Sequence, residues 1–225
     1  AKYRDAYGKE LPELDLGGGF GIAYIDGDVT VEPNDVLPQI HAAVKKACAQ
    51  HNLAIPLVSL EPGRNIVGPT MFTLYEVGTV KDVVVDGGKV RKYVSVDGGM
   101  SDNARTALYD AEYTAVIAQR NSTAPLALTR LVGKHCETGD IIINEIQLPS
   151  DIAPGDLVAT PATGAYGRSM ASNYNHMARP AVISVINGTA RTILRRESAA
   201  DLLALDIKES PRTIPGVTQN ERRDK

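Results

Sequence analysis

Hydrophobic and polar residues in the first 69 positions follow strand and helix patterns in turn. Residues 11–16 form a mostly apolar run that leads into a glycine-rich turn, and residues 56–60 indicate a second, buried strand. Between them, Asn34 or Asp35 is the expected N-cap of a helix. The order strand, turn, helix, strand, turn predicts about one and a half βα units. The apolar positions at helical spacing are Val36, Leu37, Ile40, Val44 and Ala47.

From residue 70 the pattern changes to short β-rich runs separated by turn residues. Asp86-Gly87-Gly88 predicts a hairpin turn between two of these runs. Their number and spacing predict an antiparallel β-sandwich or barrel. The runs are residues 72–77, 80–85, 91–96, 114–119, 126–132, 141–146, 157–160, 182–186 and 191–194.

The change of pattern near residue 70 suggests a domain boundary. A two-stranded parallel sheet cannot cover both its faces, and a complete (β/α)₈ barrel needs about 250 residues. We therefore expect residues 1–69 to be the C-terminal fragment of an α/β barrel and residues 70–211 to be an all-β domain. The polar residues 212–225 are expected to be a flexible tail.

Composition and charge exclude several classes of partner. The chain has 225 residues and a formal net charge of −3, with acidic and basic residues mixed along its length, which argues against binding to nucleic acid or to an anionic membrane. It has neither a signal peptide nor an apolar stretch of the roughly 18 to 20 residues that span a membrane, so we expect a cytoplasmic protein. Cys48 and Cys136 lack metal-ligand spacing, so we expect no metal site.

Two candidate cofactor segments follow the two predicted barrel strands. Backbone N–H groups of Gly17, Gly18 and Gly19 could converge on a phosphate, although glycines after a strand also form simple tight turns. Glu61-Pro62-Gly63-Arg64 offers a carboxylate and a guanidinium three residues apart. These groups could hold a cofactor with a basic ring nitrogen and a phosphate, or form a surface ion pair.

The β-rich part contains candidates for substrate contact. Arg105 and Tyr109 are four residues apart, so one helical turn would place both on a face that could share a substrate carboxylate; an exposed arginine is the alternative. Tyr166 lies in a glycine-rich turn, from which it could donate to a phosphate or simply pack.

A thiol and a carboxylate adjoin in the predicted turn between residues 132 and 141. Cys136 precedes Glu137 there, although free cysteine is normally a buried residue. Cys136 could be a general acid near neutral pH, helped by Lys134 or His135.

These segments occur in an order that resembles the diaminopimelate decarboxylases. The order is Gly-Gly-Gly, Glu-Pro-Gly-Arg, Asp-Gly-Gly-Met, Cys-Glu-Thr-Gly-Asp and Gly-Ala-Tyr, and similarity runs from about Leu14 to about Ile207. The resemblance implies an alanine-racemase-like barrel that binds pyridoxal 5'-phosphate (PLP), followed by a β domain that contributes substrate and dimer contacts. It implies decarboxylation of meso-2,6-diaminopimelate to L-lysine, the last step of lysine biosynthesis.

The resemblance also implies roles around the cofactor. The three glycines would hold the PLP phosphate, and Glu61 would keep the pyridine nitrogen protonated. Gly63 would contact the cofactor, Arg64 would lie near phosphate and substrate, and Tyr166 would approach both from the β domain.

Further roles concern the substrate. Arg105 and Tyr109 would bind its distal carboxylate, and Glu137 would bind the ammonium beside it. Cys136 would protonate the α carbon as general acid. In this family the Cys-Glu segment reaches the neighbouring subunit's active site, which implies a homodimer.

One departure from the family and two alternatives stand beside this interpretation. No segment matches the family's Schiff-base lysine, so the chain is expected to be a fragment that is inactive alone. An ornithine-, arginine- or carboxynorspermidine-type decarboxylase of the same fold is the first alternative, although its substrates lack the distal pair of charges that Arg105 and Glu137 match. A noncatalytic β-domain module for dimerisation is the second.

Overall fold

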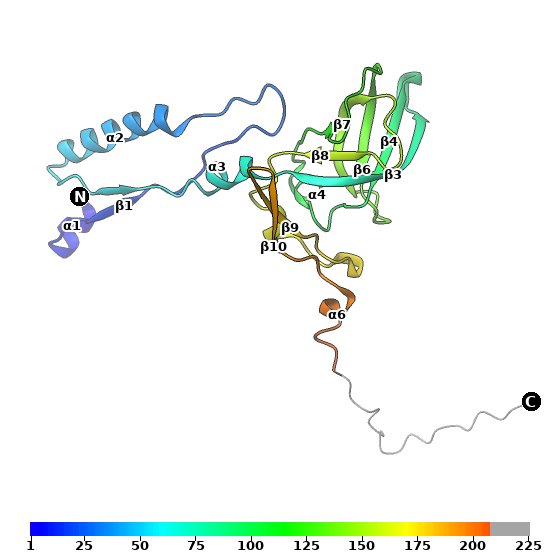
Figure 1. Ribbon diagram of the computed structural model, residues 1–225. Helices are drawn as coiled ribbons and strands as arrows, with labels where there is room; N and C mark the ends of the chain where they lie inside the picture. The colour runs from blue at the N-terminus through cyan, green and yellow to red at the C-terminus, as the bar shows by residue number, and fades with distance from the viewer. Residues whose placement is uncertain (208–225) are drawn as a thin grey trace, which may run out of the picture. The chain divides into compact units, whose positions relative to one another are not determined.

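The computed structural model describes residues 1–207, which fall into two compact units. The first unit is Ala1–Met177 and the second begins at Ala178. The predicted flexible tail, residues 212–225, lies outside the described residues. Figure 1 shows both units with their helices and strands labelled.

The first unit begins with a parallel pair of strands joined by a helix. Strands β1 (Glu13–Asp15) and β2 (Leu57–Ser59) pair in parallel, and helix α2 (Pro33–Gln50) connects them, as the sequence predicts. A short helix α1 (Lys2–Tyr7), which the hydrophobic pattern did not indicate, precedes β1. The predicted N-cap of α2 is wrong, because the helix begins at Pro33 with Glu32 as N-cap. Proline is favoured at the first helical position, where no N–H is required.

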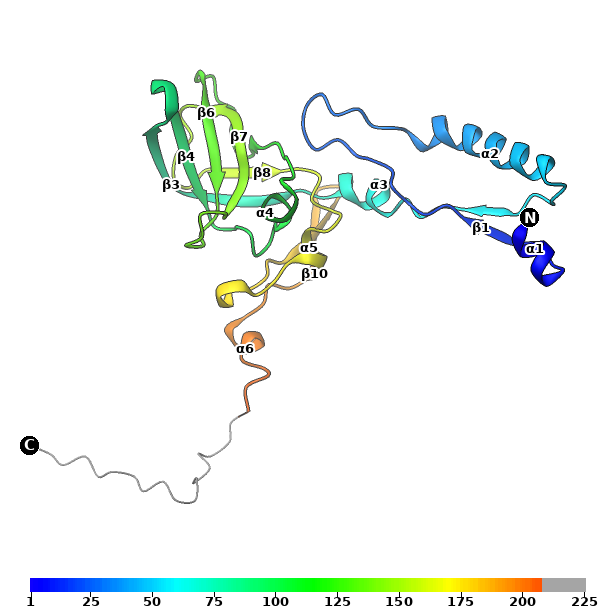
Figure 2. The ribbon, with the colours of Figure 1, turned by 180° about the vertical axis from the view of Figure 1, so that it is seen from behind.

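The rest of the first unit is built on one mixed sheet. The strand order is β5-β8-β3-β4-β6-β7, and Figures 1 and 2 show that the sheet curls on itself. The fold class predicted from the spacing of the β-rich runs is confirmed. The elements are α3 (Gly63–Val67), β3 (Thr73–Val84), β4 (Val90–Val96), α4 (Arg105–Tyr109), β5 (Val116–Ile117), β6 (Leu126–Val132), β7 (Ile141–Pro149), β8 (Leu157–Thr160) and α5 (Gly167–Met170).

Strand β3 differs from its prediction because a β-bulge replaces a chain break. The pattern indicated two runs separated at Gly78 and Thr79, but the strand is continuous and its register with β4 shifts between Val77 and Val80. The Ser95 hydroxyl accepts a hydrogen bond from the Thr79 N–H at 2.7 Å and donates one to the Thr79 carbonyl at 3.2 Å. A side chain thus bridges the disrupted part of the ladder.

One pair of neighbouring strands is parallel within an otherwise antiparallel sheet. Strands β4 and β6 pair in parallel, with Lys92 opposite Thr129 and Ser95 opposite Val132. A parallel pair needs a long crossover connection, and residues 97–125, including α4 and β5, provide it. This crossover contains Arg105 and Tyr109, so the topology places candidate substrate residues beside the sheet.

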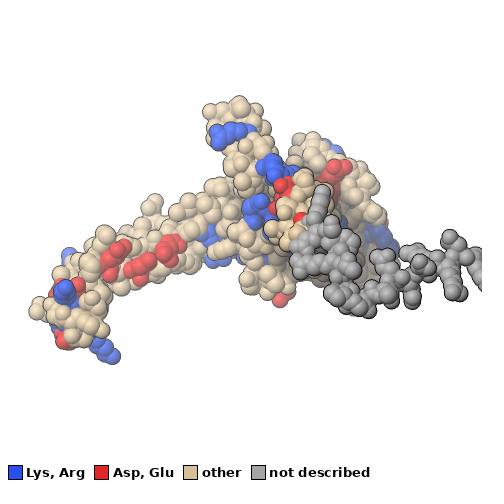
Figure 3. Space-filling model, turned by 90° about the horizontal axis from the view of Figure 1, so that it is seen from below, with Lys and Arg blue, Asp and Glu red and all other residues tan. Residues whose placement is uncertain are grey.

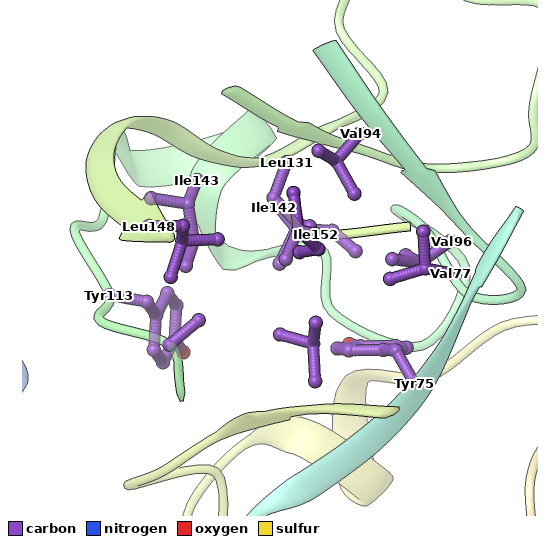
Figure 4. Close-up of a cluster of buried hydrophobic side chains, with 12 residues drawn as sticks. Tyr75, Val77, Val94, Val96, Tyr113, Leu131, Ile142, Ile143, Leu148 and Ile152 are labelled. Carbon is purple, nitrogen blue, oxygen red and sulfur yellow. The ribbon is translucent and has the colours of Figure 1, made fainter. Parts of the chain in front are cut away.

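The core lies inside the curl of this sheet. Figure 4 shows aliphatic side chains from several strands pointing toward one another, with Tyr75 and Tyr113 at the edge of the cluster. Val94 and Leu131 are both 0% exposed. Their strands alternate buried and less buried positions, as a period of two residues requires.

The second unit is a hairpin followed by a short helix. Strands β9 (Val182–Ile186) and β10 (Thr189–Leu194) are antiparallel. They are joined at Asn187 and Gly188, which have φ values of 50° and 75°. Helix α6 (Ala199–Leu202) starts with a capping box at Ser198.

The surface carries both signs of charge. Figure 3 shows acidic and basic side chains interspersed on the face that it presents, in line with the small net charge of −3. Within residues 1–207, none of the helices combines the length and the apolarity that crossing a membrane requires. The same residues include no group of three or more His, Cys, Asp or Glu side chains arranged to hold a metal ion.

Strand β6 offers a matched test of the core. Leu131→Ala should lower the free energy of unfolding by about 2–5 kcal/mol, because it removes a fully buried side chain and leaves a cavity. Leu126→Ala on the same strand, where the leucine is 63% exposed, should cost far less. Urea denaturation followed by circular dichroism measures both. Equal losses of stability would contradict this placement of the core.

Candidate functional site

The glycine loop and Glu61 lie at the adjacent carboxyl ends of two parallel strands. Beyond β1, the Leu16 N–H donates to the Ser59 carbonyl at 3.0 Å, and the Glu61 N–H donates to the Gly17 carbonyl at 2.8 Å. These bonds extend the parallel pairing past both strands. The two segments that the sequence singled out as cofactor candidates are therefore direct neighbours, at the edge where α/β folds usually bind ligands.

The backbone of this loop accepts no side chain at its centre. A Cβ on Gly18 would collide with the carbonyl oxygen of Glu61. Gly17 and Gly19 have φ values of 72° and 95°, a region that favours glycine. The Gly17 N–H donates to an Asp15 carboxylate oxygen at 2.7 Å, and in the described part of the chain no hydrogen bond uses the N–H groups of Gly18 or Gly19. Those two N–H groups are available to an anion.

The Glu-Pro-Gly-Arg motif turns from β2 into helix α3. Glu61 is exposed, whereas Arg64 is partly buried and its Nε donates to the Phe20 carbonyl at 3.4 Å. Asn65, on the next position, donates to the Gly21 carbonyl at 3.3 Å. Among the described residues no ion pair joins Glu61 to Arg64. Each charged group can therefore face a ligand independently.

A second close approach joins the Gly-Ala-Tyr turn to the segment after α3. A Cβ on Gly164 would collide with the carbonyl oxygen of Val67, and the Gly164 N–H donates to the Gly68 carbonyl at 3.1 Å. Tyr166, two residues later, has a φ of 68° and a side chain that is 46% exposed. The contact holds the turn that contains Tyr166 against Val67 and Gly68, at the end of helix α3.

Three tyrosine rings surround the Arg105 guanidinium. Its Nη1 donates to the Tyr113 hydroxyl at 2.7 Å. Its Cζ lies 4.5 Å from the ring centroid of Tyr24, 5.5 Å from that of Tyr113 and 5.8 Å from that of Tyr166. Burial raises the pKa of Tyr113, which keeps its phenol neutral. Cation–π contacts and the hydrogen bond thus fix a positive group beside the Tyr166 turn.

Tyr109 lies at the other end of the short helix that begins with Arg105. The predicted helical turn is confirmed as α4, which places the two residues four positions apart. Tyr109 is 66% exposed. No hydrogen bond or ring contact in residues 1–207 joins it to Arg105, so its side chain is open to a ligand.

The Cys-Glu turn forms a separate group. Cys136 is exposed, and its Sγ lies 3.6 Å from Oε1 of Glu137, to which it donates. The Tyr174 hydroxyl donates to the same oxygen at 2.6 Å. This hydrogen bond is the main reason that the pKa of Glu137 is lowered. Nε2 of His135 lies 2.9 Å from the Ser101 hydroxyl, so the His135 side chain is engaged with Ser101.

A buried carboxylate anchors this turn to the Asp-Gly-Gly-Met loop. Asp140 is 3% exposed and accepts hydrogen bonds from the N–H groups of Met100 at 2.6 Å and His135 at 2.7 Å. A Cβ on Gly99 or Gly133 would crowd the same carboxylate. The Cys-Glu-Thr-Gly-Asp motif therefore combines the exposed candidate pair Cys136-Glu137 with the buried Asp140 carboxylate that anchors it.

The structure brings the candidate residues into two groups. One contains the glycine loop, Glu61, Arg64, Arg105 and Tyr166, linked through Tyr24 and the Gly164 contact. The other contains Cys136 and Glu137. No hydrogen bond, ion pair or ring contact among the described residues joins the second group to the glycine loop or to the Glu-Pro-Gly-Arg motif.

Three tyrosines were not identified from the sequence. Tyr24 and Tyr113 contact Arg105 across long separations along the chain, which no local pattern indicates. Tyr174 belongs to the segment Asn173-Tyr174-Asn175-His176, whose unusual composition was the only available signal.

Two family models match adjacent parts of the chain. Residues 1–68 match the pyridoxal binding domain of the pyridoxal-dependent decarboxylases, and residues 66–164 match their C-terminal sheet domain. A curated relative, the diaminopimelate decarboxylase of Corynebacterium efficiens, is 51% identical over 92% of this chain and 45% of its own length. The chain thus spans about half the length of the curated relatives it matches.

Solved structures give the same result. Diaminopimelate decarboxylase from M. jannaschii in complex with L-lysine is 30% identical, with a TM-score of 0.82, over 91% of this chain and 45% of that one. Lysine/ornithine decarboxylase from Vibrio vulnificus, complexed with putrescine, is 27% identical with a TM-score of 0.60 over 79% of this chain and 45% of that one. From residue 1 to residue 164 the chain matches successive domains of one family, and it belongs to the pyridoxal-dependent decarboxylases.

Proposed function

We propose that the full-length protein decarboxylates meso-2,6-diaminopimelate to L-lysine, the last step of lysine biosynthesis. The observation that carries this proposal is the presence of a fixed guanidinium at Arg105 and an ionised carboxylate at Glu137. The substrate has a carboxylate and an ammonium at the end remote from the reaction, and these two side chains match them in charge. The names of the relatives and the L-lysine bound to the M. jannaschii enzyme support the same substrate.

The residues of the first group fit the family's cofactor, pyridoxal 5'-phosphate. The loop of Gly17, Gly18 and Gly19 is the cofactor cradle of this proposal. A Cβ on Gly18 would collide with the Glu61 carbonyl oxygen, and the N–H groups of Gly18 and Gly19 are available for a phosphate. Gly63 opens helix α3 two residues after Glu61, and an added Cβ there would meet no atom within 4 Å. We therefore assign the phosphate to Gly17, Gly18 and Gly19.

Each remaining residue of this group has a distinct role in the proposal. Bound pyridoxal phosphate supplies a conjugated ring that accepts the electron pair left when the substrate loses CO₂. The Glu61 carboxylate holds the ring nitrogen in its protonated form. Arg64 balances the charge of the phosphate and of the substrate carboxylate, and the Tyr166 hydroxyl contacts both cofactor and substrate.

Arg105 of the first group, Tyr109 and the second group act at the distal end of the substrate and at the α carbon. Arg105 and Tyr109 bind the distal carboxylate, and Glu137 binds the distal ammonium. The Cys136 thiol carries the proton that is delivered to the α carbon after CO₂ departs. The thiol donates a hydrogen bond to Glu137, which places it next to the residue that binds the distal ammonium.

The separation of the two groups supports a homodimer with shared active sites. Within one chain, no described contact joins Cys136 or Glu137 to the cofactor cradle. In a symmetric dimer these residues reach the cradle of the partner subunit, so each site is completed by both chains. A cytoplasmic location is consistent with this proposal, because the exposed thiol of Cys136 stays reduced there.

A second candidate is decarboxylation of ornithine or arginine by the same fold. The structural match to lysine/ornithine decarboxylase favours this reading at the level of the fold. Ornithine and arginine have no carboxylate at the distal end. The Arg105 guanidinium, which lies among three tyrosine rings, would therefore have no substrate carboxylate to bind. The charge of the site therefore favours diaminopimelate.

Release of CO₂ by the full-length protein tests the proposed function. With pyridoxal phosphate present, meso-diaminopimelate should release CO₂ and yield L-lysine, because both distal charges are matched, whereas ornithine and arginine should react poorly. Parallel assays with each amino acid measure this. Turnover of ornithine without turnover of diaminopimelate would overturn the assignment.

Substitution of Arg105 tests the distal carboxylate site. Arg105→Lys should lower kcat/KM for diaminopimelate about 10- to 100-fold, since lysine cannot reproduce the planar hydrogen bonds of a guanidinium. Arg130→Lys is the matched control, because Arg130 also lies over a tyrosine ring, 5.7 Å from the centroid of Tyr93. Steady-state kinetics of both variants give the comparison, and equal effects would argue against a substrate role for Arg105.

A further inference from the structure

Tyr174 meets the Cys-Glu turn from a distant part of the chain. Its hydroxyl donates to Oε1 of Glu137 at 2.6 Å across 37 residues. The same oxygen accepts the Cys136 thiol at 3.6 Å. Both donors use Oε1, and the side chain of Asn175 also forms a hydrogen bond with the Glu137 carboxylate. None of the roles proposed above includes Tyr174.

The position of Tyr174 is fixed from several sides. Its ring centroid lies 5.4 Å from that of His135, and the two rings are tilted by 59°. The Tyr174 N–H donates to the Ser172 hydroxyl at 3.3 Å, and the Ser172 N–H donates to the Ser101 carbonyl at 2.8 Å. Ser101 also contacts His135 of the Cys-Glu turn. Both the Tyr174 turn and the Cys-Glu turn are therefore attached to Ser101.

The backbone next to Tyr174 adopts an uncommon conformation. Asn175 and His176 have φ values of 52° and 55°, and neither is a glycine. Successive left-handed residues with side chains are costly and persist only where surrounding contacts hold them. Asn173 contributes one such contact by donating to the Met177 carbonyl at 3.0 Å. The strained turn presents the Tyr174 ring toward Glu137.

We propose that Tyr174 is a positioning residue that orients the Glu137 carboxylate for the substrate ammonium and links it to the proton-donating thiol of Cys136. This inference rests on the proposed function, in which Glu137 binds the ammonium and Cys136 donates the proton. The phenol holds Oε1 in place and so fixes the orientation of the carboxylate that binds the ligand. The Cys136 thiol and the Tyr174 hydroxyl both donate to Oε1 of Glu137. The position of the thiol therefore depends on the orientation of the carboxylate that binds the ammonium.

The pKa shifts of Glu137 and Tyr174 have the directions that this role requires. The hydrogen bond from Tyr174 is the largest cause that lowers the pKa of Glu137, and the same bond raises the pKa of Tyr174. At neutral pH the pair therefore consists of a carboxylate and a neutral phenol. Hydrogen bonds from Cys136 and Asn175 and the nearby His135 lower the pKa of Glu137 to a smaller extent. Removal of the phenol hydroxyl should raise the pKa of Glu137.

Kinetics of the full-length enzyme with Tyr174→Phe test the proposal. This variant keeps the ring contact with His135 and loses only the hydroxyl. KM for meso-diaminopimelate should rise about 10- to 100-fold, as for one lost hydrogen bond to a charged group, with a smaller fall in kcat. The acid limb of kcat/KM should move to higher pH, because Glu137 then becomes protonated at a higher pH. Tyr93→Phe, on strand β4, is the matched control and should change neither.

A double-mutant cycle separates positioning from a purely structural effect. In a Glu137→Gln background, Tyr174→Phe should change KM less than twofold, because the group through which Tyr174 acts is already altered. An unchanged KM and pH profile for Tyr174→Phe alone, or an equal effect in both backgrounds, would overturn the positioning role. Failure of the unaltered enzyme to release CO₂ from diaminopimelate would instead overturn the proposed function itself.

Discussion

Close approach of two backbone segments at a glycine is the constraint on which the candidate site depends. At Gly18 the loop after β1 lies against the carbonyl of Glu61, and at Gly164 the Gly-Ala-Tyr turn lies against the carbonyl of Val67. Neither contact leaves room for a Cβ atom. The first contact places the glycine loop beside the Glu-Pro-Gly-Arg motif, and the second places Tyr166 beside the same segment. The first contact adds to the parallel pairing of β1 with β2, which also brings the glycine loop and Glu61 together.

Neighbouring tyrosines hold the charged side chains of Arg105 and Glu137 in position. Arg105 lies among the rings of Tyr24, Tyr113 and Tyr166, which hold a cation without neutralising it. Glu137 accepts a phenol hydrogen bond from Tyr174, which favours its anionic form. A neutral partner fixes the position of an ion and leaves its charge for a ligand. The proposed substrate, with one charge of each sign at its distal end, matches this arrangement.

The sequence predicted those features that depend on local patterns. The βα unit and most strands follow from hydrophobic periodicity, and the glycine loop and Glu61 follow from their positions after two strands. Features that depend on distant residues were missed or wrong. The Gly78-Thr79 break became a β-bulge because Ser95, on the neighbouring strand, bridges it. The parallel pairing of β4 with β6 and the tyrosines around Arg105 have no local signal.

The affinity of the full-length protein for pyridoxal phosphate measures the central claim, that a glycine-lined cradle holds the cofactor phosphate. Gly18→Ala should weaken binding at least about tenfold, as for the loss of one charge-assisted hydrogen bond, because its Cβ would push the loop away from Glu61. Gly21→Ala is the control, since a Cβ there meets open space, and it should bind as the unaltered protein does. Titration followed by cofactor absorbance gives both constants. Equal affinity of the two variants would contradict the account.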